Sequence, residues 1–208
     1  ITVVNEMYDR LEGVVPSKEF NDRVLKPSVS IYVNGFPAGT GTAISDKWIL
    51  TASHLFDYDI LGRIAENDIK FTLYNGNTYE ARIIKSDRVS DLAILETVDY
   101  RFRYVANIDG DIIEPTTSVV AVGYPGGKRI RSGHFVYGVI TSIEDDRVGF
   151  IHNAPTAFGF SGGGVFSIKT LNLIGVSRSI LNTGRGAYWN MSFAVNIDKI
   201  REFLKEEK

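Results

Sequence analysis

The chain has 208 residues (23.1 kDa), 44% of them hydrophobic and 23% charged, which excludes long disorder and a collagen-like repeat and suits one domain or two small subdomains. The net charge of −2 and the pI near 6.0 argue against a protein held to nucleic acid or anionic lipid by bulk charge. No apolar run approaches the roughly 18–20 residues that cross a bilayer, and the absence of cysteine excludes disulfides, a thiolate nucleophile and a sulfur-ligated zinc site.

The first expected element is a short helix in an N-terminal extension that we place at residues 1–26. Its predicted range is Ser17–Val24, with the Ser17 hydroxyl as the cap and with Phe20 and Val24 on one face. The chain begins with Ile and not with Met, so we expect a processed or trimmed product, in which a removed signal peptide would leave no trace.

Short runs of β-branched and aromatic residues follow, separated by turn signals such as the Asn-Gly steps at 34–35 and 75–76 and the Gly-Gly step at 126–127. Each run predicts a strand, and many short strands at this spacing predict a β-sandwich or β-barrels. The predicted strands are Val29–Val33, Thr40–Ile44, Trp48–Thr51, Ile69–Tyr74, Tyr79–Ser86, Leu92–Glu96, Ser118–Val122, Phe135–Ile143, Val148–Ile151, Val165–Ile168, Leu173–Val176 and Met191–Val195.

The strands fall into two halves, 27–106 and 118–195, and the polar, proline-containing stretch 107–117 is expected to connect them. A final helix is predicted within 196–208. Asn196 is its expected cap, and its apolar stripe is formed by Ile197, Ile200, Phe203 and Leu204.

Three short stretches carry side chains suited to chemistry. They are Trp48-Ile-Leu-Thr-Ala-Ser-His54, Ser90-Asp-Leu-Ala-Ile-Leu95 and Gly159-Phe-Ser-Gly-Gly-Gly164. A serine hydroxyl is a poor nucleophile at neutral pH and needs a base, usually an imidazole, within hydrogen-bond reach. That imidazole needs a carboxylate on its other nitrogen to hold one tautomer. The three stretches together therefore indicate acyl transfer, because three motif matches in one order are much less probable by chance than any single match.

The glycines around Ser161 add to this interpretation. Gly159 lets the backbone turn, so that the N–H groups of Gly159 and Ser161 are expected to converge on a developing oxyanion. Gly162 and Gly163 are expected to leave room for a substrate backbone beside the serine.

Each stretch also has a structural interpretation when taken alone. A histidine after a strand is often hydrogen-bonded and structural, an aspartate before a strand is often a turn residue, and a glycine-rich segment is often a hairpin. His134 and His152 are expected to be structural, and no spacing of His, Asp and Glu predicts a metal site. The segment 123–127 has the glycine content of a phosphate loop but lacks its Gly-Lys-Ser/Thr ending, so we exclude that function.

The sequence resembles the chymotrypsin-fold (trypsin-like) serine proteases over about residues 27–204. The stretches ending in His54, beginning at Asp91 and surrounding Ser161 resemble that family's Thr-Ala-Ala-His, Asp-Leu-Ala-Leu-Leu and Gly-Asp-Ser-Gly-Gly signatures. Resemblance to the bacterial HtrA-like branch is carried by Gly39-Thr-Gly-Thr-Ala-Ile-Ser-Asp, Val122-Gly-Tyr-Pro-Gly, Leu173-Ile-Gly-Val and Ser192-Phe-Ala-Val-Asn-Ile-Asp-Lys-Ile.

This resemblance implies an all-β fold of two six-stranded antiparallel barrels with a C-terminal helix, and a site in the cleft between the barrels. It implies that His54 is the general base, Asp91 its orienting carboxylate and Ser161 the nucleophile. Phe160 departs from the family, because digestive relatives have an aspartate there that pairs with a new Ile amino terminus; Ile1 is therefore not expected to activate the protein. A chain of this length is also not expected to carry a PDZ domain after the helix.

The resemblance further implies a primary substrate pocket walled by Pro155, Thr156, Ser177 and Arg178. Pro155 stands where trypsin has the aspartate that selects basic residues, so basic specificity is disfavoured. Thr156 matches the threonine of acid- and glutamine-selecting relatives, but Ser177 replaces their histidine. We expect an uncharged residue in this pocket, and for Arg178 and Arg185 we expect mainly surface solvation.

The sequence therefore predicts a serine endopeptidase that acts on a protein or peptide substrate without a cofactor, metal, nucleic acid or membrane span. Two alternatives stay open: a catalytically inactive peptide-binding module on the same barrels, and a β-rich structural protein in which His54 lies far from Ser161. A secreted or extracytoplasmic bacterial location is favoured over a viral or intracellular one. The oligomeric state is not predicted.

Overall fold

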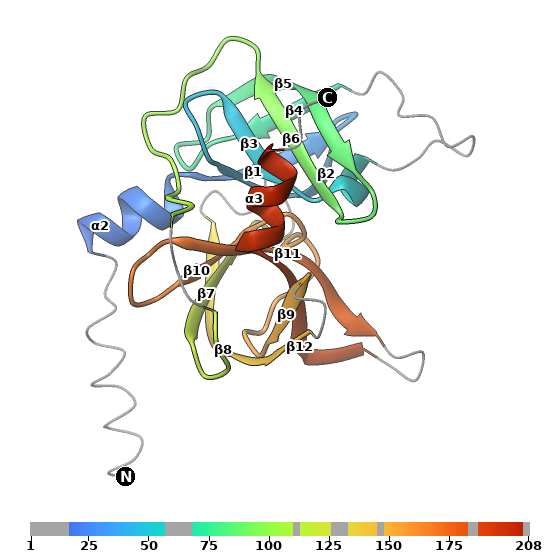
Figure 1. The fold of residues 1–208 in the computed structure, drawn as a ribbon. Coiled ribbons are helices and arrows are strands. Elements are labelled where there is room, and N and C mark those ends of the chain that lie inside the picture. Colours follow the sequence, from blue (N-terminus) through green and yellow to red (C-terminus); the bar gives the residue numbers. More distant parts are fainter. Residues whose placement is uncertain are drawn as a thin grey trace.

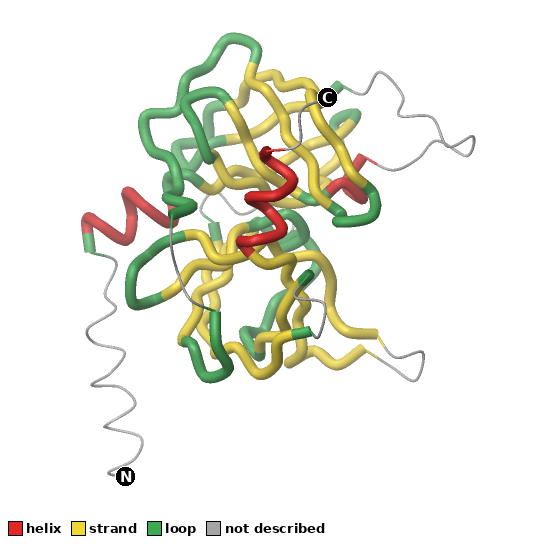
Figure 2. The backbone as a smooth tube through the Cα atoms, viewed as in Figure 1, coloured by secondary structure: helices red, strands yellow, loops and turns green. Residues whose placement is uncertain are grey.

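The computed structural model describes residues 17–56, 68–109, 113–125, 133–144, 148–182 and 187–205, with the backbone alone for 179–182 and 187–190. The expected extension before residue 17 with Ile1, the Gly-Gly step at 126–127 and Arg185 lie outside the described residues. Figure 1 shows two β-barrels stacked on each other, with the helix α3 lying across their junction. Figure 2 shows that strands form both bodies and that α3 lies between them.

The first barrel is a closed antiparallel sheet in the order β1-β2-β3-β6-β5-β4. Its strands are β1 (Ser28–Val33), β2 (Phe36–Ala43), β3 (Trp48–Thr51), β4 (Ile69–Thr72), β5 (Thr78–Asp87) and β6 (Leu92–Thr97). Antiparallel pairing of β4 with β1 closes the sheet on itself, so no strand edge is left open.

The second barrel repeats this arrangement in the order β10-β11-β12-β9-β8-β7. Its strands are β7 (Ser118–Gly123), β8 (His134–Ile143), β9 (Gly149–His152), β10 (Gly164–Ser167), β11 (Leu173–Asn182) and β12 (Ala187–Asn196). The predicted fold of two six-stranded antiparallel barrels is confirmed. Every predicted strand is present, and the largest difference is at β11 and β12, which form a long hairpin well beyond the predicted ends.

The two-residue period of a strand explains how the barrels have interiors and also pack on each other. In β3, Ile49 faces the interior of the first barrel, whereas Leu50 faces the shared core at the junction. In β7, Val119 and Ala121 fill the second barrel, whereas Val120 points to the same junction. Strands with apolar residues on both faces are therefore buried on both sides, and they join the barrels into one body.

The helix α3 (Ile197–Lys205) completes the junction. Asn196 caps it as predicted, since its side-chain oxygen accepts a hydrogen bond from the Lys199 N–H at 2.9 Å. Ile197, Ile200 and Phe203 are buried in the shared core. No helix among the described residues has the length and apolar character needed to cross a membrane.

The helix predicted near the start is present in a modified form. Ser17 accepts a hydrogen bond from the Phe20 N–H at 3.0 Å and caps α2 (Lys18–Phe20). The chain then widens into a π-helical turn, Asn21–Leu25, and Phe20 and Val24 are buried in the shared core. The predicted face is therefore correct, whereas the π-helical turn is a feature that hydrophobic spacing does not predict.

His152 is fully buried in β9, and neither of its ring nitrogens has a hydrogen-bond partner within the described part of the chain. Burial lowers the pKa of His152 from its ordinary 6.5 to about 4. The unfolded chain therefore binds more protons than the folded protein between these two values, and stability is lost as the pH falls from 6.5 towards 4.

We expect His152→Phe to remove this acid destabilisation, because a benzyl side chain beside Phe150 cannot take up a proton. Urea unfolding at pH 7 and pH 4.5 measures the effect, which is about 3 kcal/mol at its fullest. His134, at the exposed start of β8, offers the control, and His134→Gln should keep the wild-type pH dependence. Equal pH dependence of the wild type and His152→Phe would contradict the expectation.

Candidate active site

Pairing of β3 with β6 brings His54 and Asp91 together although they are 37 residues apart. In this pair, Thr51 lies opposite Ala93, so Ser53, two positions beyond Thr51, meets Asp91, two positions before Ala93. The Ser53 N–H donates to the Asp91 carbonyl oxygen at 3.2 Å and extends the ladder by one step. His54 follows in the 3-10 turn Ser53–Phe56, which turns its imidazole towards the junction.

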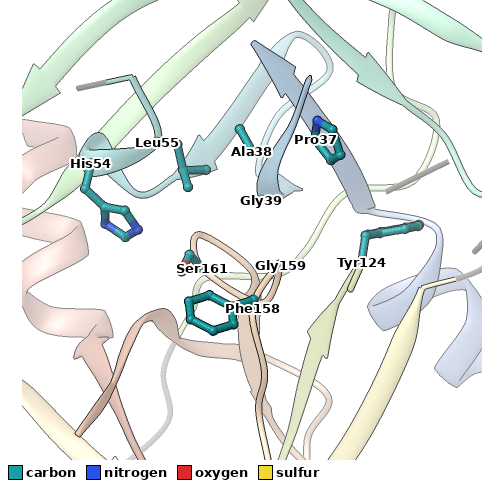
Figure 3. A pocket seen from close by; sticks show the side chains of 9 residues that line it. All are labelled: Pro37, Ala38, Gly39, His54, Leu55, Tyr124, Phe158, Gly159 and Ser161. Atoms are coloured by element: carbon teal, nitrogen blue, oxygen red, sulfur yellow. The ribbon is translucent and has the colours of Figure 1, made fainter. Parts of the chain in front are cut away.

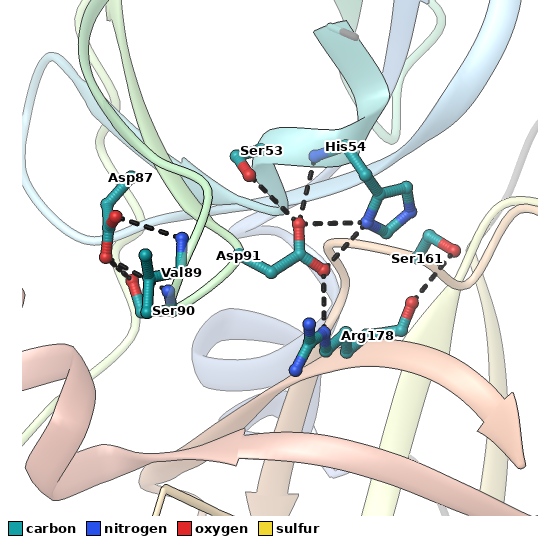
Figure 4. Close-up of polar contacts among 8 residues, drawn as sticks. All are labelled: Ser53, His54, Asp87, Val89, Ser90, Asp91, Ser161 and Arg178. Atoms are coloured by element: carbon teal, nitrogen blue, oxygen red, sulfur yellow. Dashed lines mark hydrogen bonds and ion pairs between the residues drawn. The ribbon is translucent and has the colours of Figure 1, made fainter.

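The Asp91 carboxylate is held by several donors and is only 7% exposed as a side chain. His54 Nδ1 lies 2.8 Å from Oδ2 and 3.0 Å from Oδ1. The His54 main-chain N–H and the Ser53 hydroxyl also donate to Oδ1, at 2.9 and 3.0 Å (Figure 4). Burial raises the pKa of Asp91, but the hydrogen bonds from His54 and Ser53 together outweigh it and hold that pKa below its ordinary value.

An ionised carboxylate only accepts hydrogen bonds, so the proton of the neutral imidazole belongs on His54 Nδ1. His54 Nε2 is then left as a hydrogen-bond acceptor, which is the form a general base requires. Figure 4 shows the ring with Asp91 on one side and Ser161 on the other.

Ser161 lies in the loop between β9 and β10, which docks onto β2 of the other barrel. The Thr40 N–H donates to the Ser161 carbonyl at 2.9 Å, and the Thr40 hydroxyl donates to the Gly159 carbonyl at 2.6 Å. The Ser161 Oγ donates to the Arg178 carbonyl at 3.5 Å. This last contact is long for an O–H···O hydrogen bond, so it holds the hydroxyl only weakly.

The glycines after Ser161 have a different use from the expected one. Gly162 has φ +80°, and a Cβ there would lie 2.1 Å from Thr51 Oγ1 and 2.3 Å from the Thr40 carbonyl. A Cβ on Gly163 would lie 2.1 Å from the Val122 carbonyl. Atoms of both barrels occupy the space beside these glycines, so no room for a substrate is left there. The role of the glycines is to let the serine loop approach both barrels closely.

The main-chain N–H groups of Gly159 and Ser161 make no hydrogen bond with any described residue. Gly159 has φ +99°, and a Cβ there would meet the Tyr124 carbonyl at 2.7 Å, so the turn needs glycine. Phe160 anchors this turn by burial in the second barrel, where its ring fills the space that a side chain on Gly123 would need. An apolar anchor therefore stands where digestive relatives have an ion pair.

A cavity of about 510 Å³ opens beside these groups, within the size range of small ligand sites. Figure 3 shows it extending from His54 and Ser161 towards the start of β2 and Tyr124. Its lining is Pro37, Ala38, Gly39, His54, Leu55, Tyr124, Phe158, Gly159 and Ser161. Phe158, which lines the cavity, is 85% exposed, so a large apolar surface is presented beside the serine.

The four residues expected to wall the primary substrate pocket do not line this cavity. Pro155 is exposed, and Thr156 is buried with its hydroxyl 2.5 Å from Ser192 Oγ. The Ser177 hydroxyl is buried and has no hydrogen-bond partner in the described residues. Arg178 does not follow the expectation of surface solvation, because its Nε lies 3.2 Å from Asp91 Oδ2.

Sequence reasoning did not predict three contacts of this site. Thr40 joins the serine loop to the first barrel, Ser53 holds the Asp91 carboxylate, and Arg178 approaches that carboxylate from β11. Ser53 directly precedes His54 in the quoted motif, so its position offered a signal. The partners of Thr40 and Arg178 carry no such signal, because they lie far away along the chain.

Comparison with known proteins finds similar proteins that are named as serine proteases. The chain shares 27% identity with the serine endoprotease DegS of Haemophilus influenzae, over 92% of this chain and 56% of that protein. It shares 26% identity with a probable periplasmic serine endoprotease DegP-like of Chlamydia pneumoniae, over 92% of this chain and 36% of that protein. Identity to the serine protease Do-like HtrB of Bacillus subtilis is 33%, over 48% of this chain and 20% of that protein.

The chain thus spans between one fifth and just over half of the length of these relatives. The family of trypsin-like peptidase domains matches residues 39–176, which include His54, Asp91 and Ser161 and make up well over half of the sequence. The two closed barrels are the fold that this resemblance implied. With fold, motif order and family match in agreement, the chain belongs to the trypsin-like peptidase domain family.

Proposed function

We propose that the protein is a serine endopeptidase in which Ser161, His54 and Asp91 form a catalytic triad. The observation that carries this proposal is the pairing of His54 Nδ1 with the buried Asp91 carboxylate, at 2.8 Å, at the edge of a cavity that Ser161 also lines. This arrangement leaves His54 Nε2 as the acceptor on the side of the ring where Ser161 lies (Figure 4). The family match and the names of the relatives support the same reaction class.

In the proposed reaction, Ser161 Oγ attacks the carbonyl carbon of a peptide bond while His54 Nε2 takes the hydroxyl proton. The carbonyl oxygen becomes negatively charged, and the free N–H groups of Gly159 and Ser161 donate hydrogen bonds to it. Asp91 stabilises the charged imidazole. When the tetrahedral intermediate collapses, the C–N bond breaks, and the proton moves from His54 to the leaving amine.

Water then hydrolyses the acyl-enzyme with the help of His54 and of the same two main-chain amides. Water attacks the ester carbonyl as His54 Nε2 takes one of its protons, and the same two amides bind the second oxyanion. Collapse releases the carboxylic acid product and returns the proton to Ser161 Oγ, so the protein ends the cycle unchanged.

A fluorophosphonate probe tests this function directly, because it phosphonylates only a serine hydroxyl that a neighbouring base activates. We expect the folded protein to take up one equivalent of probe, with the label located on Ser161 by mass spectrometry of the digested protein. The heat-unfolded protein is the control and should stay unlabelled. A folded protein that takes up no probe, and that binds peptides without cutting them, would instead be the inactive peptide-binding module.

The cavity predicts which substrates are cut best. His54 passes its proton to the leaving amine, so the residue after the scissile bond lies on the His54 side of Ser161. On this side the cavity is lined by Leu55, and it continues along the start of β2 to Pro37 (Figure 3). We therefore propose that a large apolar residue directly after the scissile bond is preferred.

We expect a peptide with Leu at this position to have a kcat/KM about tenfold to hundredfold above that of its Gly counterpart, the range that burial of one apolar side chain supports. Phe158→Ser should reduce this preference, while cleavage of the Gly peptide changes little. Val98→Ala, an exposed position after β6, is the matched control. A series of peptides with Leu, Ala, Gly and Asp at the position decides the point, and preference for Asp would contradict it.

A further inference from the structure

Arg178 contacts the candidate triad from two directions. Its side chain reaches Asp91, with Nε 3.2 Å from Oδ2, and its carbonyl accepts the Ser161 hydroxyl at 3.5 Å. Oδ2 is also the oxygen that lies 2.8 Å from His54 Nδ1. Figure 4 shows the carboxylate between the imidazole and the guanidinium. One oxygen is therefore shared by a base that becomes charged during the proposed reaction and by a cation that is charged at every pH.

The position of Arg178 is defined by both barrels. The residue belongs to β11 of the second barrel, whereas Asp91 precedes β6 of the first. Its guanidinium carbon lies 5.7 Å from the ring centroid of Phe193, which is buried in β12. The Arg178 side chain is 38% exposed and the Asp91 side chain 7%, so water screens the charge of Arg178 only in part.

The electrostatic consequence follows from these neighbours. Among the described residues, the titratable and charged groups in contact with the Asp91 carboxylate are His54, on the turn after β3, and Arg178, on β11. Ser53 adds an uncharged hydroxyl. The fixed positive charge of Arg178, beside the oxygen that faces His54 Nδ1, opposes the gain of a positive charge by the imidazole ring. The same ion pair also restrains the orientation of the carboxylate.

We propose that Arg178 is a positioning residue that orients Asp91 and extends the activity of the enzyme towards acidic pH by opposing protonation of His54. This inference rests on the proposed function, because it concerns the base of the same triad. It assigns to Arg178 a role that differs from selection of an acidic substrate side chain: the guanidinium is directed to a carboxylate of the protein itself.

The test compares Arg178→Met, which keeps the length of the side chain without its charge, with the wild type. We expect the acid limb of the kcat/KM profile to move to higher pH by about 0.5–1 unit, the size of one partly screened charge at short range. Arg178→Lys keeps the charge and should stay within about 0.3 unit of the wild type. Arg101→Met removes a cation that pairs with exposed Asp46 in the first barrel, and it should leave the profile unchanged.

A second measurement does not depend on catalysis. In protein labelled with ¹⁵N-histidine, NMR titration follows protonation of the His54 ring directly, and Arg178→Met should titrate at higher pH by the same amount. Arg178→Gln is measured in the same way if the Met variant does not fold. Failure of the wild type to take up the fluorophosphonate would refute the proposed function and leave this titration to be judged separately. Titration of His54 at the same pH in the wild type and in the neutral variants would overturn the role of Arg178.

Discussion

Ser161→Ala is expected to lower kcat for peptide hydrolysis by about 10⁶-fold and to leave the fold intact. The reason is local: the hydroxyl makes only a long contact, at 3.5 Å, with the Arg178 carbonyl, so its loss removes the nucleophile without removing a strong structural bond. The remaining activity comes from the free amides and from substrate binding. Hydrolysis of a peptide with Leu after the scissile bond, followed by mass spectrometry, measures the change.

The control for this variant is Ser142→Ala, which removes an exposed hydroxyl near the end of β8 and should keep full activity. Urea unfolding should give Ser161→Ala the stability of the wild type within about 0.5 kcal/mol, as for a substitution that breaks no strong contact. A Ser161→Ala protein that is folded, yet keeps more than one hundredth of the wild-type rate, would exclude Ser161 as the nucleophile.

Asp91→Asn is expected to lower kcat by about 10⁴-fold, with a much smaller effect on KM. Asp91 has φ +56°, a left-handed conformation that asparagine tolerates better than most residues, so the backbone should keep its shape. The amide, however, has one oxygen where the carboxylate has two, while Ser53 and His54 donate hydrogen bonds to this group and Arg178 forms an ion pair with it. An amide nitrogen facing His54 Nδ1 would favour the wrong tautomer and place the proton on Nε2.

The matched control is Asp46→Asn, since Asp46 is an exposed carboxylate whose ion pair with Arg101 lies away from the candidate site. It should keep wild-type kinetics. Fluorophosphonate labelling of Asp91→Asn should slow in parallel with kcat, because both reactions need the same base. A decrease of less than tenfold in a folded Asp91→Asn protein would show that this carboxylate does not orient the imidazole.

The order of the strands along the chain and the caps of both helices could be read from the sequence. The sequence pattern predicts Trp48–Thr51 with the ends that β3 has, and it predicts Asn196 and Ser17 as the helix caps that the structure shows. These features depend on contacts between residues a few positions apart, or on the alternation of side chains along a strand, and both are written locally in the sequence. The pattern predicts too short a β11–β12 hairpin, because the far end of the hairpin lacks a strong apolar alternation.

For the candidate site, sequence alone selected His54, Asp91 and Ser161, since each belongs to a short motif with its own chemical logic. Only the tertiary structure decided what surrounds them. Gly162 is required by the approach of Thr40 and Thr51 from the other barrel and not by a substrate. Arginine is a residue type usually found at the surface, but the packing of the barrels brings Arg178 to Asp91. Such contacts join segments far apart in sequence, and no local pattern encodes the partner on the other side of an interface.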